Sequence, residues 1–292
     1  MTTSGRPTAV QANPANGDML PAQTRRDDQV KSVSEATSAA PSDATQVDVR
    51  SVATEANRHA QAMNVADIGY GRIHWGNYRD TTDVPGPYYA FLGGLVASQN
   101  LRRICEIGTH TGGATRAMHR GLVDRGDARI VTIDVTRESD KALAGFADIV
   151  KITGDANEQS TVSRVLNSFA DGHRIDLLFI DGAHAYLDAL MNFAIYAQAL
   201  SPRMVVMDDV KINPDMRAVW QKVTAQRPEH TWVDVATMFP SVRAPDVGFG
   251  LIVMPENAAV PTLSQPIPRI SPVKRTMRNI VRYLASDRLG RI

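Results

Sequence analysis

Cysteine is nearly absent from the chain: Cys105 is the only one among 292 residues. A single thiol cannot form an internal disulfide, and this usage is typical of a reducing, cytoplasmic compartment. No run approaches the 18 apolar residues that a membrane span needs, and the N-terminal stretch has no apolar segment of the signal-peptide type. We therefore expect neither a secreted disulfide scaffold nor an integral membrane protein.

Aromatic residues are missing from the first 69 positions, and the whole chain has no excess of one charge. No Phe, Trp or Tyr precedes Tyr70, and residues 1–45 consist largely of Thr, Ser, Ala, Gln, Asp and Pro. Such a stretch cannot bury enough apolar surface to offset its ordering entropy, so 1–45 is predicted to be a disordered tail. The 32 Lys and Arg residues balance 31 Asp and Glu residues, which gives no reason to expect nucleic acid as a partner.

The rest of the chain divides into three predicted parts. Residues 46–85 are expected to form a helical and loop extension, and 86–255 one compact domain. Residues 256–292 combine a Pro-rich linker with a basic amphipathic helix at 273–292. That helix is expected either to pack on its own domain or to contact an anionic membrane surface, a nucleic acid or a partner.

Short apolar runs alternate with amphipathic stretches through the domain at 86–255. This alternation predicts an α/β fold with a mostly parallel sheet and helices on both of its faces. The last two of seven strands follow each other without a helix, which predicts an antiparallel C-terminal hairpin. The expected strands are 103–107, 129–133, 149–152, 175–180, 204–207, 230–236 and 248–254; the expected helices are 43–63, 88–97, 114–122, 138–146, 157–169, 184–200 and 213–226.

Three polar turns follow the first three strands, where open parallel sheets bind their ligands. The turn at 106–113 reads Glu-Ile-Gly-Thr-His-Thr-Gly-Gly and leads into a helix, whose N-terminus can bind a negative group. Asp134 can accept both hydroxyl protons of a ribose, and Asp155 with Ala156 is placed to contact an adenine edge. Tight turns and helix caps are the structural alternatives for all three.

Acidic residues also follow the fourth and fifth strands. Asp181 and His184 follow the fourth, and Asp208 with Asp209 closes the fifth. If these strands are neighbours, about 4.8 Å apart, three carboxylates meet in one small volume. Their mutual repulsion would raise their pKa values, so that some of them would hold a proton unless a cation were bound. Oxygen ligands favour a hard ion such as Mg²⁺. Helix capping and turn formation are the alternative.

These motifs together resemble class I S-adenosylmethionine-dependent methyltransferases. More narrowly, they are similar to the Mg²⁺-dependent O-methyltransferases of cephamycin and macrolide-sugar tailoring, and more distantly to catechol O-methyltransferases. The resemblance covers roughly 86–255 and implies a Rossmann-like fold with S-adenosylmethionine as cofactor. It implies that Asp134 holds the ribose, that Asp155 and Ala156 meet the adenine, and that the methionine pocket is shaped by Glu106, Gly108, Thr109 and Gly112.

The same resemblance implies roles for the acidic group. Asp181, Asp208 and Asp209 would ligate Mg²⁺, Asp181 would also border the cofactor, and His184 would be the general base for a hydroxyl of a small molecule or sugar-containing natural product. The family often has Glu in place of Asp208, so this shorter side chain is expected to reach the ion directly or through water. The acceptor walls are expected at 70–87 and 239–247, with Arg243 in the second.

Several alternatives stay open at this point. A metal-independent methyltransferase would share most of these motifs. An NAD-linked oxidoreductase is considered because Asp134 lies 21 residues after Gly113, although the glycine spacing differs from that of dinucleotide-binding folds. A non-enzymatic cofactor-binding scaffold would act through the flanking segments. The oligomeric state, including a homo-oligomer, is also left open.

Overall fold

The computed structural model describes residues 48–63, 87–123, 126–169, 174–225 and 227–254. All of the described residues belong to one compact unit. The predicted tail, the aromatic loop at 70–87 apart from its last residue, and the basic helix at 273–292 lie outside the described residues. No helix within the described ranges is long and apolar enough to cross a membrane.

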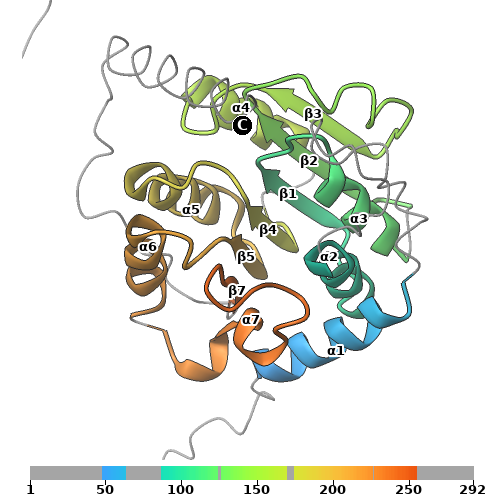
Figure 1. Cartoon of the computed structure of the whole chain (residues 1–292). Coiled ribbons are helices and arrows are strands. Elements are labelled where there is room, and N and C mark those ends of the chain that lie inside the picture. Colours follow the sequence, from blue (N-terminus) through green and yellow to red (C-terminus); the bar gives the residue numbers. More distant parts are fainter. Residues whose placement is uncertain (1–47, 64–86, 124–125, 170–173, 226, 255–292) are drawn as a thin grey trace, which may run out of the picture. The chain divides into compact units, whose positions relative to one another are not determined.

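Seven strands form one sheet in the order β3-β2-β1-β4-β5-β7-β6 (Figure 1). Neighbours from β3 to β5 pair in parallel, whereas β7 is antiparallel to both β5 and β6. This confirms the predicted Rossmann-like, mostly parallel sheet with an antiparallel C-terminal part. The strands are β1 Arg103–Ile107, β2 Arg129–Asp134, β3 Ile149–Thr153, β4 Leu177–Ile180, β5 Met204–Asp208, β6 Trp232–Asp234 and β7 Phe249–Val253.

Helices cover both faces of the sheet because successive strand side chains point to opposite sides. Ile104 of β1 belongs to a core that includes residues of α1, α2 and α3, and the next residue, Cys105, belongs to a core with α4, α5 and α6. The helices are α1 Val49–Gln61, α2 Pro87–Ser98, α3 Gly113–Gly121, α4 Gln159–Ser168, α5 Tyr186–Leu200, α6 Pro214–Thr224 and α7 Val235–Met238, with a 3₁₀ turn at Glu229–Thr231.

The helix expected at 138–146 does not form, and the segment is a series of turns. Within it only Ser139 and Leu143 are buried, so the continuous apolar stripe that fixes a helix on a core is missing. Gly145, with a φ of 91°, turns the chain toward β3.

The strand expected at 230–236 is also shorter than predicted. It is reduced to β6, with α7 directly after it, so β6 and β7 are not joined as a simple hairpin. Asp234 stops the strand because its carboxylate Oδ1 accepts hydrogen bonds from the amides of Ala236 (3.1 Å) and Phe249 (2.9 Å). The first of these contacts caps α7, and the second ties the cap to β7.

Candidate active site

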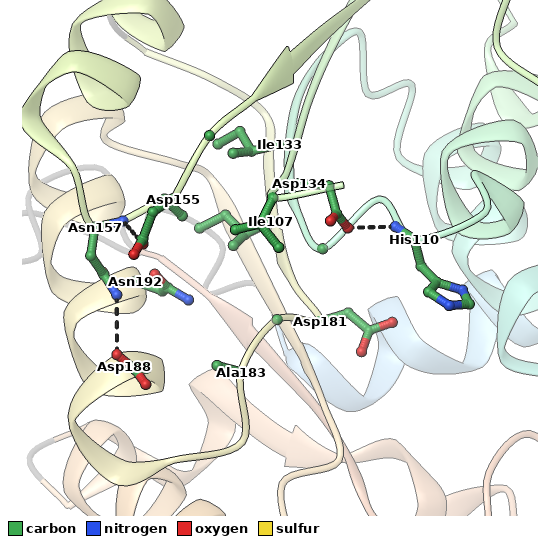
Figure 2. Close-up of a pocket in the computed structure, with 15 residues that line it drawn as sticks. Ile107, His110, Ile133, Asp134, Asp155, Asn157, Asp181, Ala183, Asp188 and Asn192 are labelled. Carbon is green, nitrogen blue, oxygen red and sulfur yellow. Dashed lines mark hydrogen bonds between the residues drawn. The ribbon is translucent and has the colours of Figure 1, made fainter. Parts of the chain in front are cut away.

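A cavity of about 240 Å³ lies beyond the carboxyl ends of β1, β2, β3 and β4 (Figure 2). Its position is the one expected for a ligand site in an open parallel sheet. Apolar side chains and carboxylates both line it, which suits a ligand with a flat apolar part and several polar groups. The lining residues are Ile107, Gly108, His110, Ile133, Asp134, Val135, Gly154, Asp155, Ala156, Asn157, Asp181, Gly182, Ala183, Asp188 and Asn192.

Asp134, at the end of β2, connects the first two loops of the cavity. Its Oδ2 accepts a hydrogen bond from the His110 amide (2.7 Å), and its Oδ1 accepts one from the Thr136 amide (2.8 Å). The first bond holds the turn after β1 against β2, as Figure 2 shows. The second resembles the predicted cap, although no helix follows. The carboxylate is therefore fixed at the cavity wall by two amide donors.

The far end of the cavity is formed by the loop after β3 and by α5. Asp155 Oδ1 accepts a hydrogen bond from the Asn157 amide (2.9 Å), and the Asn157 side-chain nitrogen lies 3.4 Å from Asp188 Oδ1. Asp188 and Asn192 are one helical turn apart on α5, and both are almost fully buried. The sequence analysis did not identify either of them. Polar side chains on the buried face of a largely apolar helix were the available signal.

Glu106 lies beneath the turn after β1 and does not line the cavity. Its Oε2 accepts hydrogen bonds from the hydroxyls of Thr115 and Thr132, the latter at 2.5 Å. Its Oε1 is buried and has no partner among the described residues. Burial raises the pKa of Glu106 to about 7, although the two threonine hydrogen bonds act in the opposite direction.

Two other predicted cofactor residues also support this turn from behind. The Thr109 hydroxyl hydrogen-bonds with that of Thr132 (2.6 Å), and the threonine is buried. Gly112 precedes α3 with a φ of 88°, in the left-handed region that favours glycine. Of the eight residues predicted to bind the cofactor, five line the cavity, namely Gly108, Asp134, Asp155, Ala156 and Asp181.

A second polar centre adjoins the cavity where β4 and β5 end. Asp181, His184 and Asp209 each offer one atom to a group whose members lie within 4.8 Å of one another; we call these three residues the carboxylate–imidazole group. His184 Nε2 lies 3.2 Å from Asp209 Oδ2, but it is buried and makes no hydrogen bond within the described part of the chain. Burial, and then the nearby Asp208 and Asp209, raise the pKa of Asp181 well above its usual range.

Asp208, the third predicted carboxylate, has a different partner. Its Oδ2 lies 2.9 Å from Nη2 of Arg243, and the same nitrogen lies 2.5 Å from Asp209 Oδ1. The sequence analysis named Arg243 only as a wall of the acceptor site, because no local pattern connects a loop residue with carboxylates 34 and 35 positions earlier in the chain. The structure thus groups Asp181 with Asp209 and His184, and places Asp208 against the guanidinium.

Residues 105–210 match the family model of a methyltransferase domain. This segment is therefore similar to a methyltransferase domain. The matched segment includes the cavity residues and the carboxylate–imidazole group, and it ends before Arg243. The match confirms the predicted resemblance to methyltransferases, and the sheet order is that of the Rossmann-like fold which the resemblance implied.

The individual proteins that the chain resembles are distant. The curated protein y4gI of Sinorhizobium fredii is 26% identical over 206 residues, which are 66% of this chain and 21% of that protein, so the match spans about a fifth of its length. The O-methyltransferase TomG of Streptomyces achromogenes, solved with S-adenosylmethionine, is 22% identical, with a TM-score of 0.47 over 65% of this chain and 88% of TomG. An O-methyltransferase of Bacillus cereus, solved with S-adenosylhomocysteine, is 19% identical, with a TM-score of 0.44 over 70% and 90% of the two chains.

Proposed function

We propose that the protein is an S-adenosylmethionine-dependent O-methyltransferase, assisted by Mg²⁺, that acts on a hydroxyl of a small molecule or a sugar-containing natural product. One observation carries this proposal: Asp181 lines the cavity and also belongs to the carboxylate–imidazole group. A cofactor bound in the cavity and an acceptor bound at the carboxylates would therefore be neighbours, which is the arrangement that group transfer requires.

The cavity residues suit S-adenosylmethionine in chemistry. Asp134 offers a fixed carboxylate for the two ribose hydroxyls, and Asp155 offers an acceptor for the adenine amine. Ile107, Ile133 and Ala156 provide apolar surface for the adenine ring. When bound, the cofactor supplies an electrophilic methyl group on a sulfonium centre. The glycine turn and the buried Glu106 would shape the methionine end.

The second centre suits one divalent cation. Asp181 and Asp209 provide hard oxygen ligands. Burial, and then the neighbouring carboxylates, raise the pKa of Asp181, and a bound cation would relieve the repulsion among these carboxylates. The buried Nε2 of His184, without a hydrogen-bond partner among the described residues, is consistent with a further group at this point. Asp208 completes the predicted set of three carboxylates. When bound, the ion supplies positive charge that lowers the pKa of an acceptor hydroxyl.

His184 is the proposed general base. A neutral imidazole can take the proton of a hydroxyl near physiological pH, and the nearby carboxylate of Asp209 would stabilise the imidazolium that results. The 34% exposure of the His184 side chain leaves an edge of the ring accessible from solvent.

The deciding experiment is thermal unfolding of the full chain with S-adenosylhomocysteine, NADH or buffer, each with Mg²⁺ or with EDTA. A ligand at 100 times its Kd adds about 2.7 kcal/mol to the folded state, a rise of roughly 5–10 °C for a domain of this size. A shift with S-adenosylhomocysteine supports the proposal, and a further Mg²⁺-dependent shift supports the ion site. A shift with NADH alone would overturn it, and an EDTA-insensitive enzyme would restrict it to metal-independent transfer.

A further inference from the structure

Arg243 contacts the acidic cluster from the loop between α7 and β7. Its guanidinium carbon lies 4.4 Å from the centroid of the Tyr88 ring, and its Nη2 donates to Asp208 and Asp209. Tyr88 is almost fully buried on α2, so this ring is part of the core. A guanidinium fixed in this way is a permanent positive charge beside the carboxylates.

Both oxygens of Asp208 are already engaged. Oδ1 accepts a hydrogen bond from the Asp209 amide (2.8 Å), and Oδ2 accepts one from Arg243 (2.9 Å), while the side chain is 1% exposed. Asp209 differs, because Arg243 contacts its Oδ1 and leaves Oδ2 turned toward His184. Asp209 can therefore bind a cation through an oxygen that Arg243 does not contact, whereas a cation at Asp208 would have to share an oxygen with an existing donor.

The net charge of the cluster also indicates that Arg243 weakens cation binding. With all three carboxylates ionised, the acidic cluster and Arg243 together carry a net charge of −2, which a single divalent ion would neutralise. A free Asp208 would give a more negative site that binds cations more tightly. Arg243 thus opposes ion binding in two ways, since it repels the cation and occupies one of its possible ligands.

We propose that Arg243 is a positioning residue that holds Asp208 out of the ion's coordination and thereby sets a moderate affinity for one divalent ion at Asp181 and Asp209. The inference rests on the proposed function, because it concerns the ion of that same site. It differs from the role that the family resemblance implied for Asp208.

The test is a titration of Mn²⁺ into the full chain, followed by calorimetry and by the EPR signal of free Mn²⁺. We expect Arg243→Met to bind Mn²⁺ at least tenfold more tightly than the wild type. In an Asp208→Asn background the same substitution should gain at least threefold less, because it then relieves only the repulsion and releases no ligand. Asp208→Asn alone should weaken binding by less than tenfold, and Asp181→Asn by more than a hundredfold.

Controls separate this role from a structural one. Arg203→Met removes another arginine–aspartate pair, with Asp176, at the opposite end of β5, and should leave Mn²⁺ binding unchanged. Loss of packing at Arg243 would loosen ion binding, so a tighter affinity is a result that a purely structural role does not produce. If Arg243→Met does not fold, Arg243→Gln removes the charge with a smaller change in polarity and carries the same expectation.

The outcomes distinguish the inference from the proposed function. Wild-type binding of Mn²⁺ that Asp181→Asn abolishes supports the ion site itself. The inference is overturned if Asp208→Asn then costs as much as Asp181→Asn, or if neither Arg243 variant tightens binding. Absence of Mn²⁺ uptake by the wild type would overturn both the ion site and the inference, while binding of S-adenosylhomocysteine would still decide whether the chain is a methyltransferase.

Discussion

Gly108 lies directly against the backbone of Asp181: a β carbon added to Gly108 would be 1.9 Å from the carbonyl oxygen of Asp181. The two loops are also joined by a hydrogen bond from the Asp181 amide to the Ile107 carbonyl (2.8 Å). The glycine turn of the cavity and the first carboxylate of the ion site are therefore one packed unit. A change in the turn should displace the carboxylate.

Substitution of Gly108 tests this contact. Gly108→Ala places a side chain at a φ of 99° and against an immovable backbone atom, so we expect a loss of about 3 kcal/mol or more in the free energy of unfolding. Gly145→Ala is the matched control, since its φ is 91° but nothing lies within 4 Å of the added carbon. It should lose only about 1 kcal/mol. Urea denaturation measures both, and equal losses would show that the contact with Asp181 is unimportant.

Asp134 should control cofactor affinity. Asp134→Asn removes a charged acceptor at the cavity wall and weakens the bond to the His110 amide, so the Kd for S-adenosylhomocysteine should rise about 10- to 100-fold. Asp140→Asn is a suitable control, because Asp140 is an exposed carboxylate paired with Lys151 and Arg137 outside the cavity. Calorimetric titration gives both constants. An unchanged Kd for the Asp134 variant would remove this residue from the ribose site.

Glu106 should make stability depend on pH. Burial raises its pKa from the usual 4.5 to about 7, so between these values the folded chain holds a proton that the unfolded chain has released. Stability should therefore fall by roughly 3 kcal/mol as the pH rises through this window and level off above it. Glu106→Gln should lose this part of the decline, whereas Glu229→Gln, at an exposed position, should retain all of it. Urea denaturation from pH 4.5 to 8 measures the difference, and identical profiles would contradict a protonated Glu106.

Local patterns predicted the strands well, because strands buried on both faces leave continuous apolar runs such as Leu177–Ile180. They also located the carboxylates, because each one directly follows a predicted strand and the carboxyl ends of parallel strands meet at one edge of the sheet. The helix predicted at 138–146 does not form, because the segment lacks a continuous buried apolar stripe. The strand predicted at 230–236 is too long, because the hydrogen bonds of Asp234 end it. Local patterns could not predict the contact between Arg243 and Asp208, because it depends on how the loop after α7 returns to the sheet.

His184 is the residue whose two possible roles lead to different measurements. As a base it would leave ion and cofactor binding nearly intact when replaced, and as a ligand it would contribute directly to ion affinity. We expect His184→Gln to keep the Kd for S-adenosylhomocysteine within about threefold and to weaken Mn²⁺ binding by less than tenfold. Turnover, measured as S-adenosylhomocysteine formed with any acceptor that the wild type methylates, should fall by about 10²–10⁴.

The pH dependence of turnover completes this test. A general base in the reaction makes kcat/KM depend on pH, and the His184→Gln variant should lose that dependence. His110→Gln is the matched control, because His110 lines the cavity but does not belong to the carboxylate–imidazole group. If Mn²⁺ binding instead disappears in His184→Gln, the imidazole is a ligand, and the proton must leave the acceptor by another route.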